Sequence, residues 1–464
     1  MTGILFVNAL YLAFGVGLLP LLRIAGDREA LVARLPLAYP VGLAASGILA
    51  AHLALIDVPL GTVELVVLAA VVLFLGLRRV RGVEAQPPHT RPVEPAWSRA
   101  VGAGALVLSL VLLAHAWATY ELRPLLEWDG WAIWGARARA LYEFGGATGP
   151  VFTSDVYLPL QHPLLLPSLE AIAYRAMGVY DPALAHVQLA LYATAFLLAF
   201  VGLLRDRVPL GLVGLGALAI LGAEPVLKQL STNLADVPLA FLVSLGLVGA
   251  GRWLATGERW PLVVGTLFLG AATLTKSEGL FFALAAFVAL LPFAWGRLRE
   301  LGLSALAVGA IVLPWRVFVA VEDLPIVEYR FRNALSPTYL SDHSERVEPA
   351  VRGLGGEIFT WDWGLLALVF AAALVAAVIA GRYALAGFAA LWTGLAFGGL
   401  VLVYWISTIP IELALIWSGD RTVVTVVVGA AALATLVAGE ALAAGERAED
   451  VEGGLLLPVP GEQA

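Results

Sequence analysis

Hydrophobic residues occur in blocks of about twenty along most of the chain, separated by short polar segments. A helix of about 20 apolar residues crosses the hydrocarbon core of a bilayer. Because a lipid-facing backbone must satisfy its own hydrogen bonds, helices are the expected structure. The pattern predicts an all-α polytopic transmembrane bundle with 13 spans, near 4–22, 36–56, 60–77, 100–120, 183–204, 208–223, 237–255, 260–275, 279–295, 301–320, 361–381, 384–405 and 421–440.

One further apolar block, 163–177, is shorter than the others and carries Glu170 and Arg175. We interpret it as a juxtamembrane or re-entrant helix rather than a span. If it does cross the membrane, one of the weaker spans must be dropped from the count.

Composition supports a membrane protein. Hydrophobic residues make up 60% of the chain and charged residues 14%, with a mean hydropathy of +0.88; soluble domains average about 25% charged residues. These values exclude a soluble enzyme, a disordered chain and a module that binds nucleic acid. The chain has no cysteine, which excludes disulfides, thiolate nucleophiles and Cys-ligated metals.

Arginines follow alternate spans, and such residues mark cytoplasmic loops. This bias predicts a multi-pass cell-membrane protein with its N-terminus outside and its C-terminus in the cytoplasm. The long polar, aromatic-rich loops then all face outward, so we expect the active site on the outer side. These loops are 121–162, 224–236, 276–278, 321–360 and 406–420.

The chain divides into three parts. We expect three N-terminal transmembrane helices and a cytoplasmic linker in 1–99, and the main membrane module in 100–440. The end, 441–464, is acidic and rich in Gly and Pro beyond its first residues, and we expect a disordered cytoplasmic tail.

The first outer loop predicts an amphipathic helix that lies on the membrane and is entered through Asp129. In a regular helix, Trp131 and Trp134 share one face. Arg137 and Arg139 follow one or two turns later, and a carboxylate facing guanidinium groups suits a site that handles a phosphate and a hydroxyl together. The structural alternatives to a functional site are that Asp129 caps a helix and that the tryptophans belong to an interfacial belt.

Two further outer segments carry charges at membrane boundaries, where ionisable residues are often functional. Asp236 opens a span after Lys228, and Lys276 and Glu278 form a charged break between two spans. The alternatives are that Asp236 only marks the start of a helix and that Lys276 and Glu278 only form a solvated hairpin. Both lysines of this arginine-biased chain fall on the predicted outer face.

The remaining outer loops add cations and one histidine. Arg330 and Arg332 suit bidentate binding of a phosphate. Asp420 and Arg421 form an acid–base pair at the start of a span, or an ordinary cap beside an exposed arginine. His162, before Pro163, is the one histidine that we single out as a candidate.

Four passages together resemble the GT-C superfamily of membrane glycosyltransferases, which use polyprenyl-phosphate sugars and include the aminoarabinose and protein mannosyl transferases. They are Trp128-Asp129-Gly130-Trp131, the run 161–167 (QHPLLLP), the run 234–241 (LADVPLAF) and the run 274–279 (LTKSEG). The order of spans and loops from about 100 to 440 is also similar.

The resemblance implies an inverting glycosyltransferase of the cell envelope, which moves a sugar from a polyprenyl-phosphate donor to an acceptor hydroxyl. Asp129 would be the base, and the acceptor would be a glycan, lipid or protein. The implied catalytic group is Asp129, Asp236, Lys276 and Glu278, and the implied donor-binding group is Arg137, Arg139, Lys228, Arg330, Arg332 and Arg421, with His162 and Asp420 as further candidates. Asp236 could orient a group or bind a divalent metal, although no clear ligand cluster supports a metal.

Two other functions fit the same pattern. A transporter or flippase of a lipid-linked or amphipathic solute explains the bundle and its boundary charges equally well. It does not explain why polarity concentrates on one face, since transporter sites usually lie near the midplane. A polymerase or ligase for surface polysaccharide would use similar lipid-linked substrates.

Overall fold

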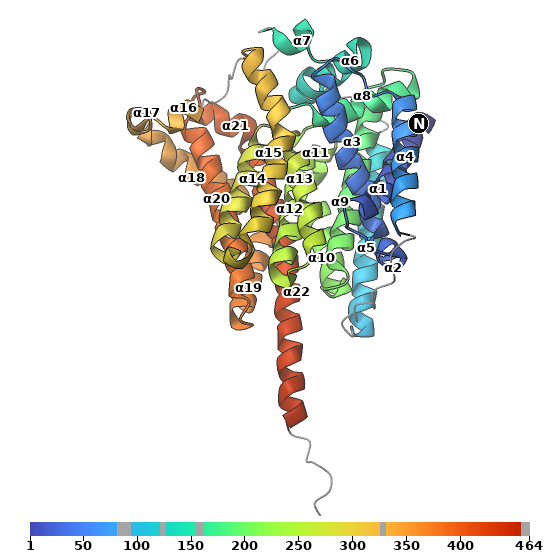
Figure 1. The fold of residues 1–464 in the computed structure, drawn as a ribbon. Helices are drawn as coiled ribbons and strands as arrows, with labels where there is room; N and C mark the ends of the chain where they lie inside the picture. Colours follow the sequence, from blue (N-terminus) through green and yellow to red (C-terminus); the bar gives the residue numbers. More distant parts are fainter. Residues whose placement is uncertain (81–93, 121–126, 155–161, 325–330, 456–464) are drawn as a thin grey trace, which may run out of the picture.

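The computed structural model describes residues 1–80, 94–120, 127–154, 162–324 and 331–455. Within these ranges the chain is helical and forms no strands, which confirms the predicted all-α bundle. The longer helices run side by side (Figure 1). The α-helices are α1 Thr2–Leu21, α2 Arg28–Arg34, α3 Ala38–Ala54, α4 Thr62–Val80, α5 Ala96–Tyr120, α6 Ala136–Phe144, α7 Pro150–Thr153, α8 Leu165–Met177, α9 Ala183–Leu204, α10 Leu210–Leu221, α11 Glu224–Leu230, α12 Asp236–Thr256, α13 Arg259–Thr273, α14 Glu278–Leu290, α15 Leu298–Val321, α16 Phe331–Ala334, α17 Pro337–Asp342, α18 Val347–Ile358, α19 Leu366–Ile379, α20 Tyr383–Trp405, α21 Ile411–Thr422 and α22 Val424–Leu455.

Short 3-10 turns and one π-helical segment complete the described elements: η1 Leu35–Leu37, η2 Asp129–Gly135 (the π-helix), η3 Leu291–Phe293, η4 Trp295–Arg297, η5 Ser344–Arg346 and η6 Trp361–Trp363.

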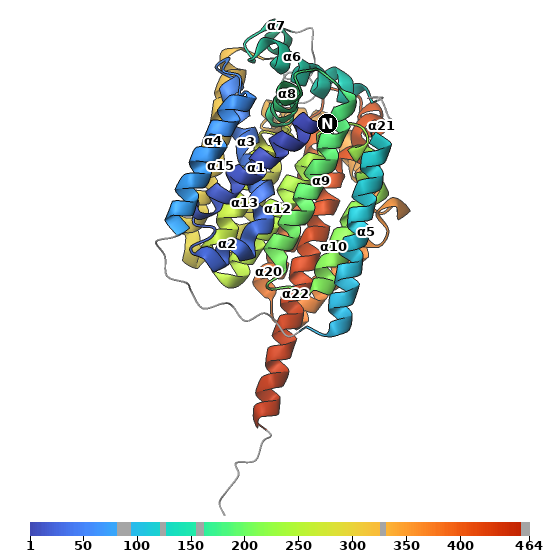
Figure 2. The same cartoon turned by 90° about the vertical axis from the view of Figure 1, so that its right-hand side faces the viewer.

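Within the described residues, 8 helical stretches are long and apolar enough to cross a membrane, or 9 if the bent pair α10–α11 is one span. The protein is therefore membrane-embedded by the length and composition of its helices. Helices α4, α13, α14 and α19 lie in the bundle as well (Figures 1 and 2) but are shorter or more charged. The count of 13 spans stays a prediction.

The two ends of the bundle differ. Helices α6, α7, α8, α16, α17 and α21 gather at one end, which we call the loop end (Figures 1 and 2). The C-terminal half of α22 projects from the opposite end, which we call the tail end. Helix α8 has 13 residues, about 20 Å at 1.5 Å per residue, which is too short for a bilayer core of about 30 Å. This length favours the interpretation of 163–177 as a helix that does not cross.

Close backbone packing builds the centre of the bundle. Helix α12 is buried along 94% of its most apolar window and packs against α9, α13 and α22. A Cβ on Gly249 would lie 2.5 Å from the carbonyl oxygen of Pro261 and 2.9 Å from the Cα of Gly265. Small residues let α12 and α13 approach this closely, as is common between membrane helices. These contacts hold α12, the helix that begins at Asp236, against α13.

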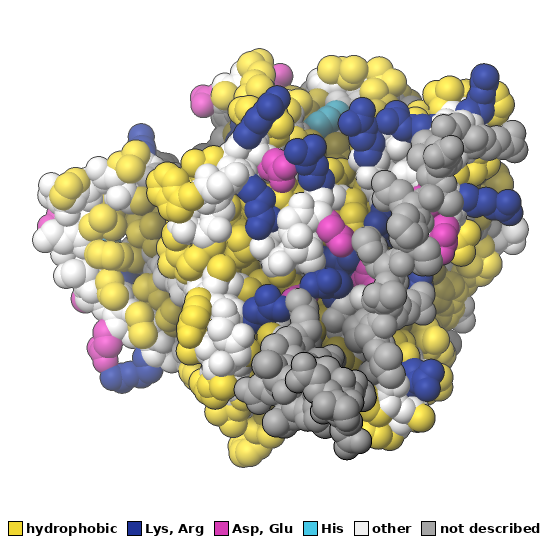
Figure 3. All heavy atoms as spheres, turned by 60° about the horizontal axis from the view of Figure 1, so that its bottom comes forward, with side chains coloured by type: hydrophobic (Ala, Val, Ile, Leu, Met, Phe, Trp, Pro, Cys, Tyr) yellow, Lys and Arg dark blue, Asp and Glu magenta, His cyan; other side chains and the backbone are white. Residues whose placement is uncertain are grey.

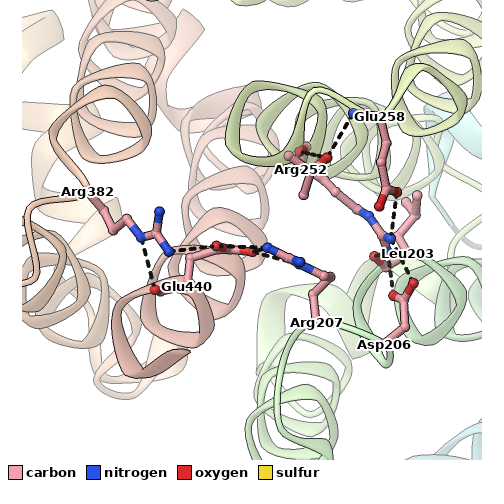
Figure 4. A network of polar contacts seen from close by, with 8 residues as sticks. Leu203, Asp206, Arg207, Arg252, Glu258, Arg382 and Glu440 are labelled. Atoms are coloured by element: carbon pink, nitrogen blue, oxygen red, sulfur yellow. Dashed lines mark hydrogen bonds and ion pairs between the residues drawn. The ribbon is translucent and has the colours of Figure 1, made fainter. Parts of the chain in front are cut away.

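Arginines spread over the tail end (Figure 3), as the charge bias of the sequence predicts for a cytoplasmic face. Several are held in networks (Figure 4). Arg252 of α12 donates to Asp206 at 2.5 and 2.7 Å and to Glu258 at 3.1 Å. Arg207 and Arg382 both contact the buried Glu440 of α22. Arg207 and Arg382 thus tie the turns after α9 and α19 to α22, and Arg252 ties the turn after α9 to α12.

Helix α22 continues to Leu455, which corrects the expectation of a disordered tail from 441. The segment 440–449 (EALAAGERAE) is rich in Ala and Glu, which are strong helix formers, and prolongs the preceding span. Residues 456–464 lie outside the described part of the chain.

The first three long helices, α1, α3 and α4, pack directly on the main module. Helix α8 lies against α1 and α3. Asp57, in the turn after α3, accepts a hydrogen bond from the backbone N–H of Thr148 at 3.2 Å, and the backbone N–H of Ala147 donates to the carbonyl oxygen of Ala54 at 2.8 Å. The N-terminal helices thus support the loop that carries Asp129.

Candidate functional site

Asp129 opens the predicted loop helix, but the helix begins with a different winding. Residues Asp129–Gly135 are π-helical and continue directly into α6. A π-helix has more residues per turn than an α-helix, so positions three apart no longer share a face. Trp131 is accordingly 51% exposed while Trp134 is 2% exposed. The prediction that these two tryptophans share a face is wrong for this reason.

The carboxylate of Asp129 pairs with a residue from the other end of the chain. Arg421 Nη1 lies 2.6 Å from Asp129 Oδ2, and the two side chains are 22% and 28% exposed respectively. Arg421 belongs to α21, which lies at the loop end (Figure 1). Both groups are mostly buried but keep some exposure at this end of the bundle, and they attract each other strongly.

A second ion-pair group lies next to the first. Lys276 Nζ is 2.7 Å from Asp236 Oδ1 and 3.3 Å from Glu278 Oε1. All three side chains are nearly buried, at 13%, 7% and 9% exposed for Lys276, Asp236 and Glu278. The turn 274–277 joins α13 to α14 and brings Lys276 over the start of α12. The structure therefore brings together Asp129, Arg421, Asp236, Lys276 and Glu278, which we call the loop-end cluster.

The two pairs act on each other electrostatically. Arg421 and Lys276 both contribute to the field at the Asp236 carboxylate. Burial lowers the pKa of Lys276, but Asp236 and Glu278 outweigh it and raise that pKa above its ordinary value. Lys276 is thus an ammonium ion at neutral pH. The loop-end cluster holds three carboxylates and two cations, so its cations are shared among several carboxylates.

His162 lies beside the cluster and is buried. Its ring is 5.4 Å from that of Trp134, and its Nδ1 lies 3.3 Å from the hydroxyl of Ser277. Burial lowers the pKa of His162 well below 6.5, and the nearby charges of Lys276, Arg137 and Arg421 lower it further. His162 is therefore neutral at physiological pH.

Arg137 is also buried, at 4% exposed, and donates from Nη1 to the carbonyl oxygen of His162 at 2.8 Å. Burial lowers its pKa to about 10, so it keeps its charge at neutral pH. This position suits an arginine that holds the segment around His162 against α6. Its predicted role in donor binding has no support from this geometry.

The other predicted residues lie around or away from the cluster. Lys228 and Asp420 are 63% and 47% exposed and lie 3.6 Å apart, at the rim beside Arg421. Arg139 points to solvent, where it pairs with Glu143 and lies 5.0 Å over the ring of Tyr180. Arg332 is exposed on α16. Arg330 falls outside the described residues.

Backbone contacts hold three distant segments in register at this site. A Cβ on Gly130 would lie 2.2 Å from the carbonyl oxygen of Thr232. The side chain of Asn233 donates from Nδ2 to the carbonyl oxygen of Gly130 at 3.4 Å, and the backbone N–H of Leu165 donates to the carbonyl oxygen of Leu274 at 2.8 Å. The contacts of Gly130 with Thr232 and Asn233 thus set the position of Asp129 relative to Asp236, and the bond from Leu165 holds the turn that carries Lys276 against α8.

Sequence reasoning missed several neighbours of the cluster. Tyr404 of α20 bonds Ser418 at 2.8 Å and Thr422 at 3.1 Å, and its hydroxyl lies within the field of Lys276 and Glu278. Asn233 and Ser277 are buried polar residues next to Asp236 and Lys276 in the sequence. These two residues could have been found from the sequence, because each lies within three residues of a charged residue that was predicted to belong to the site.

An apolar cavity of about 40 Å³ lies inside the bundle. Its walls come from α3, α8, α9, α12 and α13, and include Leu165, Leu166, Phe196, Pro238 and Phe268. Two of its wall residues are connected to segments that carry the cluster: Pro238 follows Asp236 by two residues, and the backbone N–H of Leu165 donates to the carbonyl oxygen of Leu274. Among the described residues, no group of three or more His, Asp or Glu side chains is arranged to hold a metal ion.

The fold and the site define the chain as a membrane-embedded helical protein with a charged cluster at one end. The chain matches no protein-family model, no curated protein and no solved structure. The resemblance to GT-C glycosyltransferases therefore rests on the sequence passages alone and stays a prediction.

Proposed function

We propose that the protein is a glycosyltransferase that uses a polyprenyl-phosphate sugar at the loop end of the bundle. The observation that carries the proposal is the ion pair between Asp129 and Arg421 beside Asp236, Lys276 and Glu278. It places a carboxylate, suited to accept a proton, next to two cations suited to a phosphate. These groups come from four distant segments of the sequence.

In the proposed reaction, Asp129 accepts the proton of the acceptor hydroxyl while that oxygen attacks the anomeric carbon of the sugar. The bond from this carbon to the phosphate oxygen breaks, and polyprenyl phosphate leaves with the electron pair. Attack opposite to the leaving group inverts the anomeric centre. A positioned base contributes typically 10²–10⁴-fold to such a step.

Arg421 and Lys276 would stabilise the charge that develops on the leaving phosphate. In the structure both are bonded to carboxylates, so a bound phosphate would share or replace those bonds. Release of Asp129 from Arg421 by the phosphate would also free the base for the acceptor. Donor binding and activation of the base are coupled in this scheme.

A site in a membrane-embedded bundle suits a lipid-linked donor. The apolar cavity between α3, α8, α9, α12 and α13 has a volume of about 40 Å³, which is too small for an isoprenoid chain. The lipid part of the donor would therefore lie against the outer surface of the bundle, in the hydrocarbon of the membrane.

The proposal places the loop end on the outer side of the cell membrane, because the arginine-rich tail end has the character of a cytoplasmic face (Figure 3). The acceptor would be a glycan, lipid or protein hydroxyl reached from that side.

The test uses purified protein in liposomes with a synthetic polyprenyl-phosphate sugar. We expect binding of this donor and release of polyprenyl phosphate when an acceptor extract is added. Arg421→Lys keeps a charge but loses the guanidinium geometry, and should weaken donor binding. If no polyprenyl-phosphate sugar binds while a lipid-linked or amphipathic solute crosses the bilayer, the transporter or flippase interpretation replaces this one.

A further inference from the structure

The hydroxyl of Tyr404 connects the end of α20 to the helix that carries Arg421. Tyr404 lies in the last turn of α20 and is 3% exposed. Its hydroxyl oxygen lies 2.8 Å from that of Ser418 and 3.1 Å from that of Thr422, both on α21. These two residues are one helical turn apart and flank Arg421. The phenol therefore holds the stretch of α21 from which the guanidinium extends.

The three hydroxyls form a directed chain. Each hydroxyl has one proton to donate, and Ser418 donates its proton to the carbonyl oxygen of Ala414 at 2.9 Å. Ser418 therefore accepts the proton of Tyr404, whose oxygen is left as the acceptor for the proton of Thr422. A fully satisfied buried network of this kind rigidifies the elements that it joins.

The end of α20 is a firm support for this chain. Directly after Tyr404, the indole N–H of Trp405 donates to a main-chain carbonyl oxygen of α17 at 3.1 Å. The carbonyl oxygen of Ser407 accepts from the hydroxyl of Tyr339 at 3.3 Å and from the guanidinium of Arg346. Bonds from α17 and η5 thus fix the position of the phenol from the side opposite to α21.

Arg421 depends on the orientation of α21, because its guanidinium is held at one corner. Its Nη1 donates to Asp129 Oδ2 at 2.6 Å, while its buried Nε has no partner in the described residues. Helix α21 has only 12 residues, and Ile416 on its surface is 76% exposed. A side chain lies about 5 Å from its helix axis, so a rotation of α21 by about 20° would displace it by about 2 Å. Such a shift is enough to break the ion pair with Asp129.

We propose that Tyr404 is a positioning residue for Arg421, which acts by fixing the rotation of α21 on the end of α20. With the hydroxyl chain in place, the guanidinium is held at Asp129 with its Nε–H unpaired. A buried N–H without an acceptor is unfavourable, and a phosphate oxygen of the donor would supply the acceptor. That last step rests on the proposed function, whereas the orientation of α21 by Tyr404 does not.

The first test measures the position of α21 without any substrate. Nitroxide labels are attached to Phe144→Cys on α6, the helix that continues from Asp129, and to Ile416→Cys on α21; both positions are exposed, and the chain has no native cysteine. Their distance distribution is measured in liposomes by pulsed electron paramagnetic resonance. Tyr404→Phe should broaden the distribution or shift it by about 2 Å. Tyr383→Phe, which removes an exposed phenol at the first residue of α20, is the control and should leave it unchanged.

A second variant removes the partners and keeps the phenol. The double variant Ser418→Ala, Thr422→Val should reproduce the distribution of Tyr404→Phe. Combining all three substitutions should add nothing, because the same hydrogen bonds are lost only once. If neither Tyr404→Phe nor the double variant changes the distribution, the positioning role is overturned.

Transfer from a polyprenyl-phosphate sugar tests the connection to Arg421. A displacement of about 1 Å can cost about 10²-fold in rate, so Tyr404→Phe should lower transfer by about 10–10²-fold and weaken donor binding. In Arg421→Gln it should cause no further loss of donor affinity or rate, since the group that it positions is absent. Equal losses in both backgrounds would overturn the positioning role and make Tyr404 a support of the fold alone. If the label distances respond as expected but the parent protein transfers no lipid-linked sugar, the orientation of α21 by Tyr404 stands and the proposed glycosyltransferase fails.

Discussion

Asp129 and Arg421 form a 2.6 Å ion pair although 292 residues separate them in the chain. The first lies in the π-helical start of a loop, and the second lies in α21 just before the long helix α22. A contact of this kind between a loop and the last span closes the loop end of the bundle. It also gives the proposed base a cation partner that a phosphate could take over.

The clearest prediction concerns this carboxylate. Asp129→Asn keeps the shape but cannot accept a proton, so transfer from a polyprenyl-phosphate sugar should fall by about 10²–10⁴-fold. Donor affinity should be retained or increase slightly, since Arg421 is freed for the phosphate. Single-turnover transfer and equilibrium donor binding in liposomes measure the two effects separately.

Asp420→Asn is the matched control, because Asp420 precedes Arg421 but pairs with the exposed Lys228 at 3.6 Å. It should change transfer by only a small factor. Turnover of Asp129→Asn at the parent rate would reduce Asp129 to a structural partner of Arg421.

The fold class was predictable because it depends on composition and block length alone. Membrane-length apolar blocks specify helices whatever their neighbours are. The placement of α8 at the loop end also followed from its short apolar block and its two charges. The exact number of spans did not follow, since α13, α14 and α19 are shorter than a standard span.

The site was predictable as a list of charges but not as a set of pairs. Lys276 was expected near carboxylates because Glu278 is two residues away, while its closer contact with Asp236 depends on how α12 and α13 pack. Arg421 was expected beside Asp420, and the structure pairs it with Asp129. The π-helical winding at Asp129 cannot be recognised from the spacing of hydrophobic residues in the sequence. It explains why the prediction that Trp131 and Trp134 share a face was wrong.

The buried Lys276–Asp236 pair predicts a stability effect. Lys276→Ala leaves two nearly buried carboxylates without their cation, and loss of one partner of a buried pair costs about 3–5 kcal/mol. Thermal unfolding in detergent should show a large loss of stability. Arg352→Ala breaks an exposed pair with Glu348, whose side chains are 81% and 73% exposed, and should cost less than about 1 kcal/mol. Equal effects of the two variants would contradict the buried character of the Lys276 group.

His162 predicts an acid dependence of stability. Burial and nearby cations hold its folded-state pKa well below 6.5, so the unfolded chain binds a proton first as the pH falls. Stability should therefore be unaffected above about pH 6.5 and fall below it by up to about 1.4 kcal/mol per pH unit. Unfolding midpoints measured between pH 7 and pH 5 should lose this slope in His162→Gln.

Topology can be tested directly, because the chain has no native cysteine. Two single-cysteine variants are compared, Thr338→Cys and Arg299→Cys. Thr338 is exposed on α17 at the loop end, and Arg299 is exposed near the N-terminus of α15. A membrane-impermeant thiol reagent added to intact cells should label the first and spare the second until the membrane is opened. The reverse pattern would place the proposed site in the cytoplasm, where a donor in the outer leaflet cannot reach it.

The last prediction uses the lack of space at Gly130. A Cβ there would lie 2.2 Å from the carbonyl oxygen of Thr232, which is main chain and cannot rotate away. Gly130→Ala should therefore push the turn 231–235 away from the start of the π-helix and lengthen the path between Asp129 and Asp236. Overpacking of this kind costs typically 1–3 kcal/mol, and a displaced base would lower transfer further than the stability loss explains.

Gly149→Ala, where a Cβ meets nothing within 4 Å, is the control in the same loop. Transfer rate and unfolding midpoint, measured for both variants on the same preparation, separate the two effects. If Gly130→Ala loses stability but transfers at the parent rate once folded, the 231–235 turn supports the fold without setting the geometry at Asp129.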